Sequence, residues 1–272
     1  NKSELHKAIL SDHEKFSRYA EYNHAFSAPE KDPVVKRYEV EERTTQDKED
    51  GSSLTIWSDK KYYLADDTAT VYASLRNTEG QTIPTTFIGQ LIFNEKVNLQ
   101  TFTLNDHDQD GVYESTLPLS QAEGTIEAGL YKVLIVNNKN KLTDALPFIL
   151  SEPEIQLSGN FKDSLTPQNE LLIQAEVIVS KKQRFYFQAS LYSANQIAIG
   201  SSQQALELSP GKHWVALPFD GNMIKDSGES GPFLLKNISL AKVTVPMQRA
   251  PLDKTEYFTQ DYALNQFISS NI

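Results

Sequence analysis

From residue 54 onward, the sequence consists of short stretches in which apolar and polar residues alternate, and turn residues separate one stretch from the next. Alternation with a period of two places every second side chain on the same face of an extended strand. No helical periodicity lies among these stretches, so their number and spacing predict a β-sandwich. The first set comprises residues 54–57, 68–75, 86–93, 99–104, 112–117, 130–136 and 145–150.

A second set of alternating stretches begins after Pro153 and predicts a second β-sandwich. We therefore expect an all-β chain with two tandem immunoglobulin-like β-sandwiches, at residues 51–151 and 152–248, followed by a tail at 249–272. Strands and helices do not alternate, which argues against a doubly wound nucleotide-binding fold. The strands of the second set are expected at residues 155–161, 171–179, 185–192, 205–208, 214–219 and 234–245.

The first 50 residues follow a different pattern and predict a short helix, a strand and a linker. Ser3 is a suitable N-cap, and apolar residues recur at helical spacing as far as Ala20. The helical pattern fades near Phe26, before two prolines. We expect a strand at 37–41 and a polar linker at 44–53.

Composition excludes several classes of function. Acidic residues outnumber basic ones by 36 to 26, which gives a formal net charge of −10. Lys and Arg do not gather with aromatic residues, so we expect no nucleic-acid partner, and cations or basic proteins suit this charge better. The chain has no cysteine, which excludes thiol catalysis, disulfides and cysteine-ligated zinc. No run of about 20 apolar residues occurs, so we expect no membrane span.

The strongest local chemical signal is an acidic loop. Asp106, Asp108 and Asp110 stand at alternate positions and are followed by Gly111. In the first half of a calcium loop, the residues at positions 1, 3 and 5 turn toward one centre, and glycine allows the sharp bend. This spacing predicts that the loop binds Ca²⁺, in a structural rather than a catalytic role.

The rest of the loop departs from the helix–loop–helix calcium motif. Val112 falls at the position that supplies a backbone carbonyl, and Glu114 falls at position 9. Position 12, however, is Leu117 instead of the bidentate glutamate, and strands flank the loop. The alternative interpretation is an acidic β-hairpin turn whose carboxylates are solvated.

Two further patterns were considered for binding and catalysis. The large aromatic residues Trp57, Tyr62, Tyr63 and Trp214 would suit a platform for sugars or peptides, although such residues are more often part of a core. Residues 226–232 superficially resemble the nucleophile segment of trypsin-like proteases. The match fails at its start, and no suitable histidine precedes it. We therefore expect no enzymatic activity.

A resemblance to a known family comes from the C-terminal third. A glycine-containing motif made of Gly221, Ile224, Ser227, Gly228, Gly231, Pro232 and Phe233 is followed by Thr259, Tyr262 and Phe267. Earlier in the chain, Gly129-Leu130-Tyr131 suits a corner where a tyrosine hydroxyl donates to nearby backbone. Between residue 54 and the end, the chain resembles a proteobacterial exported domain-of-unknown-function family with tandem immunoglobulin-like domains.

This resemblance implies the fold and an exported location, periplasmic or extracellular, rather than a reaction. Our hypothesis is a non-enzymatic exported protein whose immunoglobulin-like domains bind an unidentified protein partner or act as spacers. Two alternatives remain open. The domains would form a carbohydrate-binding or adhesion module for a cell-surface glycan, or they would be accessory domains of a secreted enzyme.

Overall fold

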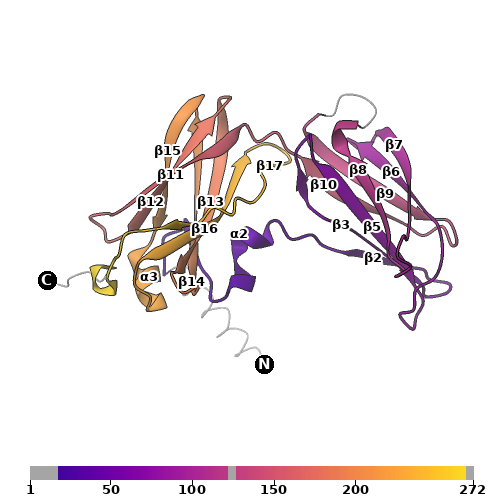
Figure 1. The fold of residues 1–272 in the computed structure, drawn as a ribbon, viewed down its shortest axis with the longest axis horizontal. Helices are drawn as coiled ribbons and strands as arrows, with labels where there is room; N and C mark the ends of the chain where they lie inside the picture. Colours follow the sequence, from indigo (N-terminus) through magenta and orange to yellow (C-terminus); the bar gives the residue numbers. More distant parts are fainter. Residues whose placement is uncertain (1–17, 122–126, 268–272) are drawn as a thin grey trace, which may run out of the picture. The chain divides into compact units, whose positions relative to one another are not determined.

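The structure is a computed structural model that describes residues 18–121 and 127–267 (Figure 1). β-strands dominate it, which confirms the predicted all-β class. The chain forms two compact units. The first unit consists of Tyr38–Glu152 and Thr244–Ala250, and the second of Asn1–Arg37, Pro153–Val243 and Pro251–Ile272. No helix among the described residues is long and apolar enough to cross a membrane.

The first unit has two sheets, whose strands are antiparallel except for the parallel pair β4 and β10. The five-stranded sheet has the order β4 (Tyr62–Tyr63), β10 (Thr143–Leu150), β9 (Gly129–Asn137), β6 (Phe87–Phe93) and β7 (Val97–Leu104). The four-stranded sheet has the order β2 (Arg43–Gln46), β3 (Ser53–Ser58), β5 (Thr68–Arg76) and β8 (Tyr113–Pro118). The 3₁₀ helix η2 (Leu119–Gln121) follows β8, and β17 (Gln248–Arg249) lies in the segment Thr244–Ala250, which also belongs to this unit.

Alternation explains the core of the first unit. All seven predicted stretches form strands, and their inward residues pack into one buried cluster from both sheets. Ile56 and Val71 come from the four-stranded sheet, and Leu91 and Val133 from the five-stranded sheet. The hydroxyl of Tyr131 donates to the Glu127 carbonyl at 2.7 Å, which confirms the predicted tyrosine corner.

The second unit also has two sheets. The larger has the order β1 (Asn23–Ala25), β14 (Ala198–Leu208), β13 (Gln183–Ser193) and β16 (Phe233–Lys242), with β18 (Tyr257–Phe258) beside β16. The smaller has the order β11 (Ile155–Leu165), β12 (Leu171–Val179) and β15 (Gly211–Phe219). Its helices are η1 (Pro29–Lys31), α2 (Pro33–Lys36), α3 (Gly221–Ser227) and η3 (Leu264–Phe267).

The structure corrects the expectations for the first 50 residues. Most of the expected N-terminal helix lies outside the described residues, and residues 18–26 form turns and the strand β1 instead. The strand expected at 37–41 is irregular. The expected linker at 44–53 contains most of β2 and the start of β3. β2 is polar because it is an exposed edge strand, and its Thr44 hydroxyl lies 3.0 Å from that of Thr55.

The helix α3 was not predicted from the sequence. Asp220 caps its N-terminus by accepting a hydrogen bond from the Asn222 amide at 2.7 Å. Gly228 ends it in the left-handed conformation, with a φ of 74°. An N-capping aspartate and a left-handed glycine are standard signals for the start and the end of a helix. Here they enclose a helix of only 7 residues.

A buried carboxylate holds the N-terminal segment in the second unit. The side chain of Asp32 is fully buried and caps α2 through the Val34 amide at 2.9 Å. It also accepts hydrogen bonds from Ser190 Oγ at 2.7 Å, Tyr192 Oη at 2.8 Å and Asn237 Nδ2 at 3.0 Å. A buried charge is tolerable when hydrogen-bond donors replace the lost water. Asp32 therefore links α2 to strands β13 and β16.

A second carboxylate holds the C-terminal tail. Asp163 on β11 accepts hydrogen bonds from the hydroxyls of Tyr257 and Tyr262, the latter at 2.6 Å. The tail also approaches Gly231, whose amide donates to the Tyr262 carbonyl at 2.7 Å. A Cβ at Gly231 would lie 2.5 Å from the Tyr262 nitrogen. Packing against the tail therefore explains why the motif has a glycine at position 231.

We predict that Asp32→Ala destabilises the second unit by about 3 kcal/mol, because the donors of Ser190, Tyr192 and Asn237 lose their acceptor. Urea unfolding monitored by tyrosine fluorescence measures the change. The control is Asp261→Ala, at an exposed position of the same unit, which should shift stability by less than about 0.5 kcal/mol. Equal effects of the two substitutions would contradict the role of Asp32.

We also predict that the second unit loses stability as the pH rises above about 10, the usual tyrosine pKa. Burial, and then the bond to Asp163, raise the pKa of Tyr262 and of Tyr257 well above that value. Between the two pKa values the unfolded chain releases protons that the folded unit keeps, so the free energy of unfolding falls. Thermal melts between pH 8 and pH 11 test this. Tyr262→Phe should be less stable at pH 8 and show a shallower alkaline decline, and a decline as steep as the parent's would contradict the assignment.

Candidate metal site in the loop between β7 and β8

The acidic loop connects the two sheets of the first unit. It leaves the five-stranded sheet at the end of β7 and enters the four-stranded sheet at the start of β8. At its base, Asn105 and Glu114 exchange both backbone hydrogen bonds, each at 2.9 Å. The bridge closes the loop and fixes where its acidic residues stand.

The three aspartates predicted as ligands converge. One carboxylate oxygen from each of Asp106, Asp108 and Asp110 lies within 4.8 Å of the other two. Asp106 is half-buried and the other two are exposed. Backbone amides within the loop donate a hydrogen bond to each carboxylate, and the amide of Gly111 donates to Asp106 at 3.0 Å. The predicted spacing therefore produces a cluster of oxygen atoms.

One oxygen of this cluster is not satisfied by the protein. Asp106 Oδ2 accepts the Gly111 amide, but Asp106 Oδ1 is buried and has no hydrogen-bond partner among the described residues. A buried acceptor without a partner costs free energy, and a carboxylate oxygen costs more than a neutral one. A cation bound at this point would supply the missing contact.

The other two predicted ligands behave differently. The Val112 amide donates to Asp110 Oδ1 at 2.7 Å, so the backbone of Val112 belongs to the loop. Glu114 lies on β8 opposite Tyr72 of β5, outside the group of three converging carboxylates. Its charge contributes, after burial, to the raised pKa of Tyr72. The structure thus brings the three aspartates together, whereas Glu114 belongs to β8 and is not one of the converging carboxylates.

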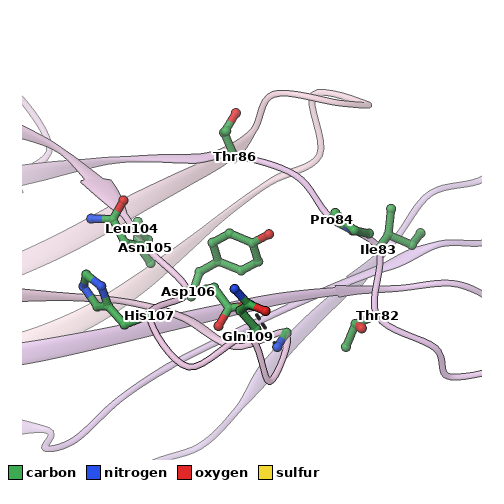
Figure 2. Close-up of a pocket in the computed structure, with 11 residues that line it drawn as sticks. Thr82, Ile83, Pro84, Thr86, Leu104, Asn105, Asp106, His107 and Gln109 are labelled. Carbon is green, nitrogen blue, oxygen red and sulfur yellow. Dashed lines mark hydrogen bonds between the residues drawn. The ribbon is translucent and has the colours of Figure 1, made fainter.

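A pocket of about 590 Å³ lies beside the loop (Figure 2). Asp106, His107 and Tyr113 line it together with Thr82 and its neighbours. Gly111 has a φ of 85°, and a Cβ there would lie 2.2 Å from Thr82 Cγ2. Only glycine therefore fits between the loop and the 82–86 segment.

The aromatic residues considered for a ligand platform have different surroundings. Trp57 stacks on Tyr72 in the first unit, with ring centroids 5.4 Å apart and an interplanar angle of 11°. Trp214 belongs to the second unit, where it is 40% exposed and has Lys162 Nζ 4.2 Å from its ring centroid. The aromatic residues considered together are thus distributed over both units.

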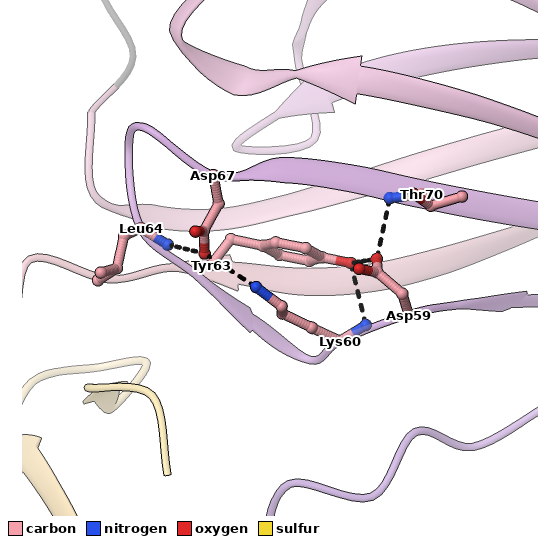
Figure 3. A network of polar contacts seen from close by, with 6 residues as sticks. All are labelled: Asp59, Lys60, Tyr63, Leu64, Asp67 and Thr70. Atoms are coloured by element: carbon pink, nitrogen blue, oxygen red, sulfur yellow. Dashed lines mark hydrogen bonds and ion pairs between the residues drawn. The ribbon is translucent and has the colours of Figure 1, made fainter. Parts of the chain in front are cut away.

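Tyr63 has a structural role in the first unit, and Figure 3 shows the polar contacts around it. Its ring is buried in the core, and its hydroxyl donates to Asp59 Oδ1 at 2.5 Å and accepts the Lys60 amide at 3.1 Å. The same Asp59 oxygen accepts the Thr70 amide at 2.9 Å. Burial, and then Asp59, raise the pKa of Tyr63. The residue holds the turn between β3 and β4 and offers no ring face to a ligand.

The protease-like segment is also structural. Ser227 is at the end of α3, and its hydroxyl donates to the Ile224 carbonyl at 2.6 Å. Asp226 forms an ion pair with Arg18 at 2.7 Å and accepts the Tyr19 hydroxyl at 2.8 Å. The Ser227 side chain therefore bonds the last turn of the helix, and the Asp226 side chain binds the N-terminal segment.

Comparison with solved structures gives distant likenesses. A DUF4785 family protein from Legionella pneumophila is 21% identical with a TM-score of 0.49, and the match covers 80% of this chain and 59% of that one. The BSP domain of a biofilm-associated protein is 12% identical with a TM-score of 0.26, and the match covers 75% of this chain and 28% of that one. The chain thus spans about three fifths of the length of the Legionella protein.

A search of curated proteins found no match. Among family models, the C-terminal domain of DUF4785, a domain of unknown function, matches residues 156–250. These residues run from the start of β11 through β16 and β17, and so take in most of the strands of the second unit. The comparisons thus relate residues 156–250 to the C-terminal domain of the DUF4785 family.

Proposed function

We propose that the chain is a non-enzymatic exported protein, periplasmic or extracellular, whose β-sandwich units bind a protein partner or act as spacers. In this proposal the first unit carries a structural Ca²⁺ in the loop between β7 and β8. Two observations support the calcium site: carboxylate oxygens of Asp106, Asp108 and Asp110 converge, and the buried Asp106 Oδ1 has no hydrogen-bond partner among the described residues.

The donor set suits a hard cation. Ca²⁺ takes carboxylate and carbonyl oxygens in flexible geometry, whereas the softer transition metals prefer nitrogen or sulfur. Three converging carboxylates repel one another, and the hydrogen bonds that backbone amides of the loop donate to them offset only part of that repulsion. A divalent ion would convert the repulsion into attraction.

The position of the loop gives the ion a structural role. The loop joins the edge strand of one sheet to the edge strand of the other. An ion held by Asp106, Asp108 and Asp110 would therefore stiffen the point at which the two sheets meet. Rigid sandwich units suit spacers and protein-binding modules better than a chain whose sheets separate at one edge.

The expected affinity supports an exported location. The loop has no bidentate glutamate at position 12, and Glu114 lies outside the group of converging carboxylates. We therefore expect a dissociation constant on the order of 10⁻⁴ M, in the range of extracellular modules. Such a site would be filled at the millimolar calcium outside cells, and it would be nearly empty at cytosolic calcium levels.

We predict that millimolar Ca²⁺ stabilises the first unit by about 1.4 kcal/mol, because the ion binds only the folded loop. This corresponds to a rise of about 5 °C in its melting temperature relative to chelator. Asp108→Ala should remove the rise. The matched control is Asp66→Ala, at an exposed turn of the same unit, which should keep it.

Differential scanning calorimetry with calcium, magnesium or chelator measures these shifts. Magnesium should produce a smaller rise, because it demands a stricter octahedral geometry than this loop provides. If chelator leaves the first unit's transition unmoved and Asp108→Ala melts like the parent in calcium, the loop is a solvated turn.

A further inference from the structure

A polar pocket of about 410 Å³ lies in the second unit, against its larger sheet. The sheet contributes Gln188 of β13 and Ser201 and Gln203 of β14 to the lining. Gln188 and Gln203 stand directly opposite each other in the paired strands, and Ser201 is two residues from Gln203, so the three side chains share one face. The next residue, Ser202, bonds Pro218 of the smaller sheet, so the pocket is on the face turned away from that sheet.

Two of these side chains are almost fully buried but keep an unused donor. Gln188 is 3% exposed and Ser201 is 2% exposed. Gln188 Oε1 accepts a hydrogen bond from Arg37 Nε at 2.9 Å, whereas Gln188 Nε2 has no partner among the described residues. The Ser201 hydroxyl has none in this part of the chain either. Polar groups removed from bulk water are normally paired, so these two donors point to a group that comes from outside the chain.

One cation and one anion line the same pocket. Arg37 follows α2, and its bond to Gln188 holds the guanidinium in place while both Nη atoms lack a partner within the described residues. Glu21 is exposed, and its carboxylate pairs with no cation that the structure describes. Arg37 and Glu21 therefore line one pocket without forming an ion pair with each other.

We propose that this pocket binds a small molecule that carries both a carboxylate and an ammonium group, which is the chemistry of a free amino acid. The carboxylate accepts two parallel hydrogen bonds from the guanidinium of Arg37, and further ones from Gln188 Nε2 and Ser201 Oγ. The ammonium group pairs with Glu21. A phosphate fits less well, because Arg37 alone opposes its charge and Glu21 repels it. The volume of about 410 Å³ is within the usual range for small ligands.

Isothermal titration calorimetry of the full chain with each of the common free L-amino acids tests this binding. We expect at least one of them to bind with a dissociation constant of about 1 mM or lower. The amide of that amino acid lacks the carboxylate, and its N-acetyl form lacks the ammonium group. Each of these derivatives should bind at least about tenfold more weakly than the amino acid itself.

Two neighbouring serines separate binding from stability. Ser201→Ala removes a hydroxyl that bonds no other described residue, so it should weaken binding about tenfold and leave the melting temperature unchanged. The matched control is Ser202→Ala, whose hydroxyl donates to the Pro218 carbonyl at 2.7 Å outside the pocket. It should lower the melting temperature and leave binding unchanged.

Arg37→Lys keeps the charge but loses the two parallel donors, so we expect it to weaken binding at least about tenfold. Its matched control is Arg184→Lys, at an exposed position of β13 outside the pocket, which should bind like the parent. The proposal is overturned if no amino acid binds at about 10 mM, or if Ser201→Ala and Arg37→Lys both leave the binding unchanged. An amide or N-acetyl derivative that binds as tightly as the amino acid would also overturn it.

Discussion

Hydrogen bonds to carboxylates hold the irregular parts of this chain against its sheets. Asp32 is the most buried of these groups, and its donors come from α2, β13 and β16. Asp163 holds the C-terminal tail through two tyrosine hydroxyls, and Glu170 accepts the hydroxyl of Tyr22 beside β1. Each carboxylate is stabilised by donors that cannot titrate near neutral pH. The described segments 18–37 and 251–267 are consequently integral parts of the second unit.

The acidic loop is an exception to this arrangement. Asp106 Oδ1 is, among the described residues, the buried carboxylate oxygen that lacks a partner. Elsewhere the protein supplies a hydroxyl or amide to such oxygens, as Tyr63 and Thr70 do for Asp59. The contrast within one molecule is the physical reason for proposing a cation at the loop. The cluster of three aspartates stands where the two sheets of the first unit meet.

The sequence predicted those features that depend on local periodicity and spacing. Most of the longer strands of both units, the tyrosine corner at Tyr131 and the convergence of alternate aspartates after β7 are of this kind. Features that depend on distant partners were missed. β1 becomes a strand because it pairs with β14, and Asp32 finds donors about 160 to 205 residues away. Glu114 is not one of the converging carboxylates because it already belongs to β8, where pairing with β5 places it opposite Tyr72.

The most direct measurement of the central claim is a crystal structure of the protein grown with calcium, with an anomalous difference map recorded for the loop. The account predicts one strong peak within about 2.3 to 2.6 Å of carboxylate oxygens from Asp106, Asp108 and Asp110. Asp106 Oδ1 should be among the ligands. A map without a peak at the loop, with Asp106 Oδ1 bonded to water or to a protein donor, would contradict it.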